Sequence, residues 1–247
     1  MKVLVNCTPI DVIDIKAGIE QVAQWGQAHE SRVVNFCNVH SIVTASQSNE
    51  FAKALSEGDL NLADGAPIAK WITDKHKLKQ LRISGPDFMG EYFIAAKGWK
   101  EKIYLYGNTE AVLSKLIVEI NKSYPWIEIV GSYAPPYREG AQLESASWIS
   151  EINESGANTL WVSLGCPKQE LWQALHKRKI RCVMLAVGAA FPLMAGHIPR
   201  APKWMQEHSL EWLYRLYQEP SRLIGRYVST NIRFGLFLLR DYFVKDK

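Results

Sequence analysis

The chain has 247 residues and a net charge of +4 at pH 7, with 47% of its residues hydrophobic and 22% charged. This composition is typical of a globular protein with one large core. The small positive charge, without a recognisable motif, argues against a nucleic-acid-binding protein. Four scattered cysteines offer neither a CxxC pair nor metal-ligand spacing, which favours a reduced, cytoplasmic protein. The N-terminal apolar run is too short for a signal peptide, and no stretch reaches the roughly 18 apolar residues of a membrane-spanning helix.

The first hundred residues alternate short apolar runs with helical patterns. Near the N-terminus, a short strand precedes an amphipathic helix at 13–28. The predicted strands that follow are 32–37, 60–63 and 81–84. The predicted helices open at Asn38, cover 49–56, follow Pro67 and cover 88–97, the last with Asp87 as its N-cap.

From residue 102 the alternation becomes regular. The predicted strands are 102–106, 126–130, 159–164 and 182–187. The predicted helices are 109–123, 143–155 and 167–176. Repeats of this length indicate parallel βαβ crossovers, so we expect an α/β fold with an open, mostly parallel sheet and helices on both faces. The domain boundary predicted lies near the proline-containing turn at 199–202, between a core at 1–199 and an appendage at 200–247.

Glycine turns follow three of the predicted strands, at Gly107-Asn108, Gly165-Cys166-Pro167-Lys168 and Gly188-Ala189. Ligands of an open α/β sheet bind beyond the carboxyl ends of its strands, where glycine lets the backbone approach a phosphate and helix N-termini present N–H groups. Pro167 suits the first helical position, and Lys168 adds a cation. Taken singly, each turn has an ordinary explanation, because turns between a strand and a helix commonly contain glycine. Three at one edge predict a phosphate-bearing ligand, although none is a GxGxxG or Walker sequence.

Polar side chains follow the strands of the N-terminal half. Asp64, directly after a buried strand and before Gly65, would face the same edge and could act as a general base, or it could be a turn residue that bonds its own backbone. Asn38 and His40 could likewise be ligands, or cap and turn residues. Arg82 stands in a short predicted strand and needs a partner, either an anionic ligand or a structural ion pair.

Beyond Pro220, which ends the preceding helix, the chain is predicted to form one or two further helices. Its arginines fall within roughly 40° of one another around such a helix; they are Arg222, Arg226, Arg233 and Arg240. The opposite face is apolar and carries Leu223, Ile224, Tyr227, Val228, Ile232, Phe234, Leu238 and Leu239. A basic stripe backed by a wide apolar face is typical of a helix in a membrane interface. A helix docked on the core and a coiled-coil or dimer seam are the alternatives.

Longer motifs carry a resemblance to a known family. They are Asn38 with His40-Ser41, Asp64-Gly65, Arg82 with Gly85 and Asp87, Gly107, Gly131, Gly165-Cys166-Pro167-Lys168-Gln169-Glu170, Arg200-Ala201-Pro202, 210–215 (LEWLYR), and Glu219-Pro220 with Arg222. In this pattern, from about Val33 to Arg226, the chain is similar to the WecG/TagA/CpsF glycosyltransferases (glycosyltransferase family 26). These bacterial enzymes transfer a sugar from a nucleotide donor to a lipid-linked acceptor.

The resemblance implies a Rossmann-like core and an inverting, metal-independent transferase without a cofactor. Asp64 matches the family's proposed catalytic base, and Asn38, Arg82 and Gln169 match its other active-site positions. The resemblance also implies a UDP-sugar donor and a polyprenyl-diphosphate-linked saccharide acceptor, with the protein peripheral on the inner face of the bacterial cell membrane. The sequence contains no Asp-x-Asp to hold a divalent ion on a diphosphate, so cationic side chains must stabilise the leaving nucleotide.

Further substrate-binding residues are expected at the strand ends and in the tail. They are His40, Gly65, Gly107, Asn108, Gly165, Pro167, Lys168, Glu170, Gly188, Arg215, Arg222 and Arg226. The three arginines of the tail would lie over the active site, against the phosphates of donor or acceptor. The resemblance also makes a dimer or trimer plausible.

The chain departs from the family's pattern at three positions. Family members often carry Asp where this chain has Pro192, a position associated with the nucleotide base, so the uridine contact must differ or come from backbone. Some members carry Thr at Phe36, and a phenyl ring there, unable to donate a hydrogen bond, would shape the sugar pocket for another donor. A basic residue that is common at Gly225 is missing.

Two other functions compete with glycosyl transfer. The glycine turns also suit the dinucleotide of a nicotinamide-dependent oxidoreductase, although the Gly-rich fingerprint and the acidic ribose ligand are absent. The tail alone would suit a non-catalytic, membrane-bound scaffold. A binding screen of UDP against NAD separates the oxidoreductase from a transferase. Deletion of the residues after Arg200 tests the scaffold, because an enzyme should lose its activity on the lipid acceptor while its core still binds nucleotide.

Overall fold

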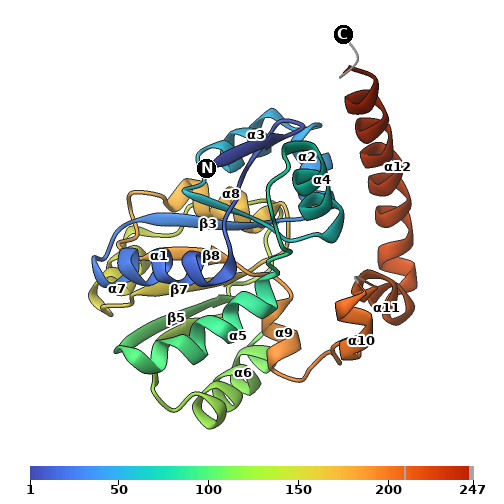
Figure 1. The fold of residues 1–247 in the computed structure, drawn as a ribbon. Coiled ribbons are helices and arrows are strands. Elements are labelled where there is room, and N and C mark those ends of the chain that lie inside the picture. Colours follow the sequence, from blue (N-terminus) through green and yellow to red (C-terminus); the bar gives the residue numbers. More distant parts are fainter. Residues whose placement is uncertain (209, 245–247) are drawn as a thin grey trace.

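A six-stranded parallel sheet forms the centre of the molecule. The computed structural model describes residues 1–208 and 210–244. All neighbouring strands of the sheet run parallel, in the order β4-β3-β8-β7-β5-β6 (Figure 1). The strands are β3 (Arg32–Cys37), β4 (Leu60–Ala63), β5 (Glu101–Gly107), β6 (Ile127–Tyr133), β7 (Thr159–Ser163) and β8 (Val183–Ala186). The predicted open parallel sheet is confirmed.

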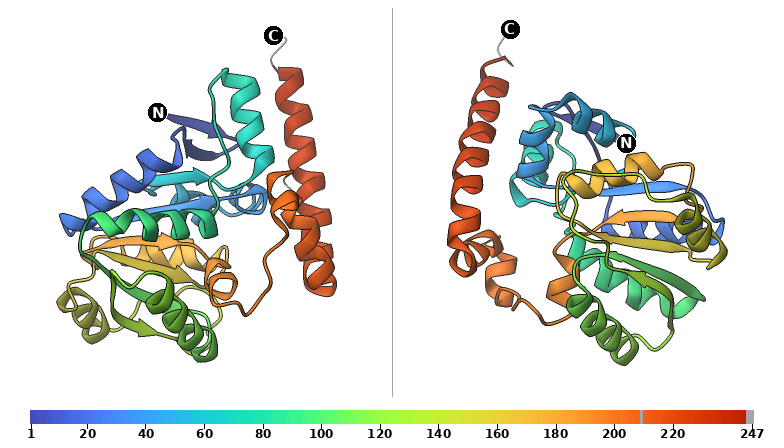
Figure 2. Two further views of the ribbon diagram at one scale, coloured as in Figure 1. Left: turned by 60° about the horizontal axis from the view of Figure 1, so that its bottom comes forward. Right: turned by 180° about the vertical axis from the view of Figure 1, so that it is seen from behind.

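Helices cover both faces of this sheet, as Figure 2 shows. One face packs against α1 (Ile15–Gln27), α5 (Gly85–Ala95) and α6 (Glu110–Ser123), with the short η1 (Ala96–Gly98) after α5. The opposite face packs against α7 (Ala146–Glu154) and α8 (Lys168–His176). Around β3 and β4 a further apolar cluster holds α2 (Val39–Ala45), α3 (Asn49–Ser56) and α4 (Ala66–His76). This layered arrangement is the predicted α/β fold, and it leaves the strand ends free to carry a site.

Buried aromatic side chains hold the helices to the sheet. On one face, Tyr92 and Phe93 of α5 meet Trp161 of β7 edge to face, with ring centroids 5.4 and 5.1 Å apart. On the other face, Tyr106 of β5 stacks on Trp172 of α8 at 4.4 Å. All five side chains are almost completely buried. Since each aromatic pair adds roughly 0.5–1.5 kcal/mol beyond the burial of its area, α5 and α8 are fixed firmly against opposite faces.

The N-terminus forms a hairpin rather than the single strand predicted. β1 (Lys2–Val5) and β2 (Thr8–Asp11) pair antiparallel. Asn6 takes a positive φ of 56° in the turn between them, a conformation that Asn tolerates better than most residues. The turn sequence Asn-Cys is not one of the strong hairpin signals, which is why the second strand was missed. The hairpin lies beside β4, where Asp11 Oδ2 accepts the backbone N–H of Asn61 at 2.8 Å.

The strand predicted at 81–84 is wrong. The segment is extended, and its backbone hydrogen bond to the sheet runs from Ile83 N to Ala63 O, at 2.9 Å. Because β4 ends at Ala63, no further ladder can form. Ser84, not Asp87, is the N-cap of α5, and its hydroxyl accepts the backbone N–H of Asp87. The helix therefore begins three residues earlier than predicted.

Two further boundaries differ near the far end of the sheet. β6 continues to Tyr133, three residues beyond the predicted end. α7 begins at Ala146 rather than at 143, because Ser145 is its N-cap and accepts the backbone N–H of Trp148 at 3.2 Å. Glu144 fixes the loop between β6 and α7 to α8, because its backbone N–H donates to His176 Nε2 at 3.0 Å.

The C-terminal quarter leaves the sheet and continues as helices. They are α9 (Ala190–Met194), α10 (Lys203–Glu207), α11 (Glu211–Gln218) and α12 (Pro220–Val244). α12 runs along one side of the body (Figure 2) and buries Leu223 and Phe234. Trp71 of α4 donates its Nε1–H to Asp241 Oδ2 at 3.1 Å, and Lys75 pairs with the same carboxylate. None of the helices within the described ranges combines the length and the hydropathy that crossing a membrane requires.

A glycine is required where β5 ends. Gly107 has a φ of 106°, and a Cβ on it would lie 2.4 Å from the carbonyl oxygen of Ser163 on β7. Side chains rarely adopt this backbone conformation, and the contact is far below van der Waals distance. The ends of β5 and β7 can therefore come this close only with glycine at 107.

We expect Gly107→Ala to destabilise the fold by at least about 2 kcal/mol, through the combined effects of positive φ and overpacking. Urea denaturation followed by circular dichroism measures this difference. Gly225→Ala is the matched control, because Gly225 has ordinary helical space with no atom within 4 Å of an added Cβ, and alanine there should stabilise slightly. Equal effects of the two substitutions would contradict the close approach.

Candidate functional site

The predicted site residues gather at the carboxyl ends of neighbouring strands. Asn38 follows β3, Asp64 follows β4, and Gly188 lies two residues beyond β8. Gly107 ends β5, and Gly165 lies two residues beyond β7. Because these five strands are consecutive neighbours in the sheet, the residues form one continuous edge, which we call the rim. The rim has an acidic part at β3 and β4 and a glycine-rich part at β8, β7 and β5.

Asp64 occupies the acidic part of the rim. Its backbone N–H donates to Cys37 O at 2.9 Å, which places it between the ends of β3 and β4. Its side chain keeps 20% exposure, and Oδ1 lies 3.6 Å from Arg82 Nε. Burial raises the pKa of this carboxyl to about 7, with Arg82 opposing the rise and Glu211 and Asp87 adding to it. A carboxylate that is partly protonated near neutral pH and open to solvent can accept a proton from a substrate hydroxyl.

A chain of alternating charges connects Asp64 to the C-terminal helices. Arg82 donates from Nη2 to Glu211 Oε2 at 2.8 Å. The other oxygen of Glu211 lies 3.8 Å from Nε of Arg200, and Arg200 in turn pairs with Asp87. We call these five residues the charge chain. For Arg82, the structure therefore shows the ion pairs that the sequence left as one of two alternatives.

Asn38 and His40 lie at the start of α2. Asn38 is the N-cap, and its Oδ1 accepts the backbone N–H of Ser41 at 3.2 Å. His40 Nδ1 is buried without a hydrogen-bond partner, and the pKa of the ring is lowered by burial and by the nearby Arg226. A Cβ built on Gly65 would lie 3.7 Å from the Cα of Asn38. The loops after β3 and β4 thus touch directly beside Asp64.

A serine that the sequence did not single out connects the glycine-rich loops. Ser163, the last residue of β7, accepts the Nδ2–H of Asn108 at 3.0 Å and donates to Gly188 O at 2.7 Å. Asn108 also donates its backbone N–H to Ser163 O at 2.8 Å. Asn108 and Gly188 both have positive φ. The loops after β5, β7 and β8 are therefore held as one unit.

Gln169 holds the same part of the rim from α8. Its Oε1 accepts the backbone N–H of Gly165 at 3.1 Å, and its Nε2 donates to Ala186 O at 3.0 Å and to Glu170 Oε1 at 3.1 Å. The side chain is buried. A Cβ on Gly188 would lie 3.2 Å from Gln169 Oε1. The amide is thus engaged within the protein, which favours a positioning role over direct contact with substrate.

Glu170 is the second carboxyl of the site with a perturbed proton affinity. Burial raises its pKa to about 7, and Gln169 and Cys166 oppose the rise. Its Oε2 is buried without a hydrogen-bond partner. Because the side chain is only 2% exposed, Glu170 supports Gln169 from behind rather than facing the rim.

The start of α8 differs in detail from the prediction. The helix begins at Lys168, so Pro167 is the residue before it rather than its first residue. Lys168 Nζ donates to Arg138 O at 2.7 Å and lies 5.3 Å from the centre of the Tyr137 ring. Lys168 therefore secures the loop between β6 and α7 at this end of the rim.

Arg215 of α11 acts on the acidic part of the rim, because it is near enough to Asp64 to lower the pKa of its carboxyl. Arg226 of α12 lies beside His40, and its guanidinium is 5.5 Å from the centre of the Tyr227 ring. The side chain of Arg222 lies outside the described residues.

Two of the three positions at which the chain departs from the family's pattern, Phe36 and Pro192, are buried, whereas Gly225 is exposed on α12. Phe36 packs edge to face on Phe88 at 5.4 Å, in the core beneath the rim. Pro192 lies in α9, and its carbonyl accepts the backbone N–H groups of His197 and Ile198. Any effect of Phe36 on a sugar pocket would therefore act through packing rather than through contact of its ring with the sugar.

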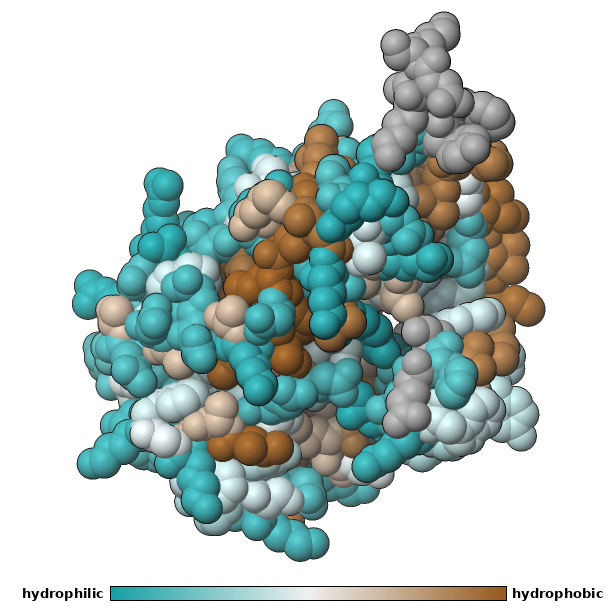
Figure 3. Space-filling model, in the orientation of Figure 1, coloured by the Kyte–Doolittle hydropathy of each residue, from teal (hydrophilic) through white to brown (hydrophobic). Residues whose placement is uncertain are grey.

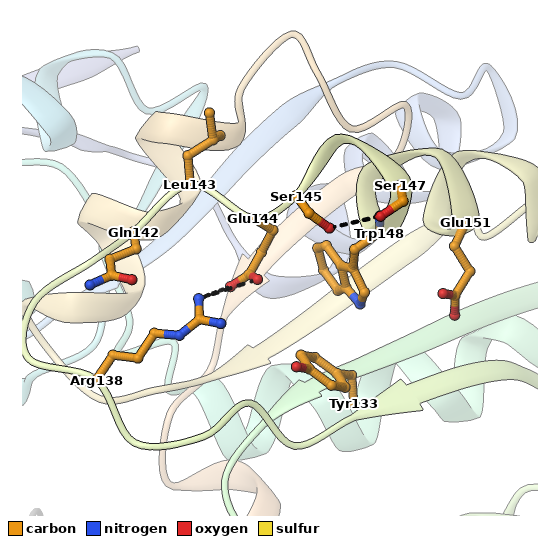
Figure 4. Close-up of a pocket in the computed structure, with 9 residues that line it drawn as sticks. All are labelled: Tyr133, Arg138, Gln142, Leu143, Glu144, Ser145, Ser147, Trp148 and Glu151. Atoms are coloured by element: carbon orange, nitrogen blue, oxygen red, sulfur yellow. Dashed lines mark hydrogen bonds and ion pairs between the residues drawn. The ribbon is translucent and has the colours of Figure 1, made fainter.

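A cavity of about 690 Å³ lies beyond the β5 end of the rim, beside the end of β6 and the start of α7. Its lining includes Tyr133, Trp148 and an ion pair between Arg138 Nη1 and Glu144 Oε1 at 3.2 Å (Figure 4). β6 is the edge strand farthest from β4. At about 4.8 Å per strand the cavity is roughly 20 Å or more from Asp64, too far to share its chemistry.

The carboxylates of the rim are paired with guanidinium groups. Within residues 1–208 and 210–244, no group of three or more His, Cys, Asp and Glu side chains is arranged to hold a metal ion together. Glu211, Arg200 and Asp87 were not predicted as site residues, although each lies in or beside a motif that carries the family resemblance. Their pairing joins segments more than a hundred residues apart, which no local pattern reveals.

Known proteins resemble this chain over almost its whole length. A sequence model of the glycosyl transferase WecG/TagA/CpsF family matches residues 3–247. One relative is the N-acetylglucosaminyldiphosphoundecaprenol N-acetyl-beta-D-mannosaminyltransferase of Bacillus subtilis (strain 168). The two are 28% identical over 191 residues, which is 77% of this chain and 73% of the relative. The resemblance deduced from the motifs is confirmed.

The raised pKa of Asp64 predicts how stability depends on pH. The folded chain binds this proton more tightly than the unfolded chain, so the stability it contributes is present below pH ~4 and is lost as the pH rises towards about 7. Asp64→Asn stays neutral throughout. We expect the free energy of unfolding of the variant, relative to wild type, to rise by roughly 2–4 kcal/mol between pH 4 and pH 8.

Urea unfolding at the two pH values measures this difference. Asp74→Asn is the matched control, because Asp74 is 60% exposed and pairs with Lys70 on the surface of α4; its difference should change by less than about 1 kcal/mol. An Asp64→Asn difference that stays constant with pH would contradict the raised pKa.

Proposed function

The chain belongs to the WecG/TagA/CpsF family of glycosyltransferases, and from its site we propose that it moves a hexose-type sugar from a UDP-sugar to a polyprenyl-diphosphate-linked saccharide, with inversion and without a metal ion. The observation that carries the mechanism is the partly exposed Asp64 carboxyl beside Arg82 at the carboxyl edge of the sheet. Family membership makes the chain an enzyme and sets aside the oxidoreductase and scaffold alternatives. The product serves cell-surface polysaccharide or glycopolymer synthesis.

In this proposal Asp64 is the general base. The acceptor hydroxyl transfers its proton to the carboxylate while its oxygen attacks the anomeric carbon of the donor sugar. The bond from that carbon to the UDP oxygen breaks, and UDP leaves with the electron pair. One displacement inverts the anomeric centre. The pKa of about 7 suits this step, because the carboxylate is available at neutral pH and still basic enough to take the proton.

Guanidinium groups would balance the charge on the leaving diphosphate. Arg82 has five N–H donors, of which Glu211 engages one through the hydrogen bond from Nη2. Arg215 lies near the same carboxylate. Preorganised donors of this kind act strongly where the chain excludes water. The backbone of the glycine-rich loops, fixed by Ser163 and Gln169, would hold the nucleotide phosphates next to them.

The identity of the acceptor is supported by the relative. The name of the B. subtilis enzyme describes transfer of an N-acetyl-β-D-mannosaminyl group to N-acetylglucosaminyldiphosphoundecaprenol. A long polyprenyl chain remains in the bilayer, so an enzyme that uses such an acceptor must work at a membrane surface. We therefore place the protein at the inner face of the cell membrane, as a peripheral protein.

α12 offers the apolar surface that this location requires. Its exposed apolar residues, each 54–60% exposed, are Ile224, Val228, Ile232, Leu236 and Leu239. They fall within about 120° around the helix, nearly opposite the buried Leu223 and Phe234. Figure 3 shows hydrophobic side chains along the outer side of α12. The helix is therefore docked on the core by one face, as one alternative had it, and keeps a second face that we assign to lipid.

We expect Asp64→Asn and Asp64→Ala to lower turnover by about 10²–10⁴-fold, the usual contribution of a positioned base, and to leave UDP binding within a few-fold of wild type. The assay supplies a panel of UDP-sugars and a polyprenyl-diphosphate-linked N-acetylglucosamine, with and without EDTA. Asp74→Asn, on the surface of α4, should retain wild-type turnover. Near-normal turnover of the Asp64 variants would remove it from the base role, and loss of turnover in EDTA would contradict metal independence.

Loss of apolar side chains from the outer face of α12 should weaken membrane binding. We expect Val228→Ser with Ile232→Ser to lower the partition coefficient onto phosphatidylglycerol-containing vesicles by about 30–1,000-fold, since each side chain contributes roughly 1–2 kcal/mol on burial. Co-sedimentation measures the partition. Val118→Ser, at a 66% exposed valine on α6, is the control and should bind as wild type does. Equal binding by all three proteins would overturn the assignment of α12 to lipid.

A further inference from the structure

The acid that faces Arg82 has no role in the mechanism so far. We propose that Glu211 is a positioning residue for the transfer reaction, which holds the guanidinium of Arg82 in place beside Asp64 and supplies a fixed negative charge next to the base. The inference rests on the proposed function, because it assigns Glu211 a part in the chemistry of the same site.

The geometry of Glu211 is that of a bridge between two guanidiniums. One oxygen accepts from Arg82 Nη2 at 2.8 Å, and the other lies 3.8 Å from Arg200 Nε. Its side chain is only 12% exposed. A carboxylate this deeply buried is stable only when it is paired. Glu211 therefore has a defined position, and so does each guanidinium that it contacts.

The contact with Glu211 also determines how Arg82 faces Asp64. Arg82 contacts Glu211 through Nη2 and Asp64 through Nε, with 3.6 Å between Nε and Oδ1. The guanidinium is planar and rigid, so the contacts at two of its nitrogens together restrict the direction of the remaining N–H groups. With Glu211 in place, the remaining N–H groups of Arg82 keep a constant orientation towards the place where a leaving phosphate would lie.

The charge of Glu211 acts directly on the base. Four charged groups act on Asp64: Arg82 from the segment before α5, Asp87 from α5, and Glu211 and Arg215 from α11. The two acids raise its pKa and the two arginines lower it. Without the charge of Glu211, the guanidinium of Arg82 would act on Asp64 without that opposing charge. The pKa of Asp64 would then be lower, which would make Asp64 a weaker base.

A purely structural role is the competing explanation, since Glu211 also joins α11 to the body of the protein. Asp241 provides the comparison, because it joins α12 to Trp71 and Lys75 of α4 and is not among the groups that act on Asp64. Glu211→Gln and Asp241→Asn each remove one charge from a buried attachment of the C-terminal helices. Only the first removes a charge beside the base.

The test compares pH–rate profiles of wild type, Glu211→Gln and Asp241→Asn. For Glu211→Gln we expect the plateau of kcat to fall by about 10–100-fold, the effect of a misplaced catalytic group, and the acid limb to move to lower pH. The sign follows because Asp64 must be ionised to act, and removal of a neighbouring negative charge lowers its pKa. Asp241→Asn should leave the acid limb at the wild-type pH, whatever its plateau.

A second measurement does not depend on activity. The carboxyl of Asp64 is titrated by ¹³C NMR in wild type and in both variants, and assigned by its absence from Asp64→Asn. A lower midpoint in Glu211→Gln alone supports the proposal. Unchanged midpoints, or equal shifts in both variants, would overturn it and leave Glu211 as a structural attachment. If no sugar is transferred by wild type, the proposed function fails, and the titration still decides whether Glu211 acts on Asp64.

Discussion

The site depends on the burial of the Asp64 carboxylate among other charges. Removing an ionised carboxylate from water is strongly unfavourable unless a partner compensates, and Arg82 is that partner. Burial raises the pKa of Asp64 to about 7, although the pairing with Arg82 opposes the rise. Glu211, which shares the guanidinium of Arg82, adds to the rise through its negative charge. This arrangement of charges requires that Asp64, Arg82 and Glu211, which come from three separate segments, meet at one place.

The fold supplies this meeting place by means of the sheet. Parallel strands bring their carboxyl ends to one edge, and two side chains keep the loops there from moving independently. Ser163 joins the turns after β5 and β8, and Gln169 joins the turn after β7 to the end of β8. Such internal hydrogen bonds leave backbone groups oriented before a ligand arrives, which lowers the entropy that binding must offset.

Periodicity and motif spelling predicted the sheet, its parallel sense, the position of Asp64 and the family. These features are local, or repeat along the chain. The pairing of Arg82 with Glu211 could not be predicted, because the two residues are 129 positions apart and each is typical of a solvated surface. The two apolar faces of α12 were merged into one in the sequence interpretation. Phe234 and Val228 are both apolar in the sequence. Phe234 is buried and Val228 exposed because only one side of α12 contacts α2 and α4.

The hairpin beside β4 has a consequence for association between chains. β4 is an edge strand, and an uncovered edge can recruit a strand from a neighbouring molecule. Here Asp11 accepts the backbone N–H of Asn61, and the backbone N–H of Ile83 occupies the carbonyl of Ala63. These backbone groups, which could otherwise pair with a strand of another chain, therefore already have hydrogen-bond partners within the molecule. β4, the strand that ends directly before Asp64, is consequently protected against the intermolecular β-aggregation to which bare edges are prone.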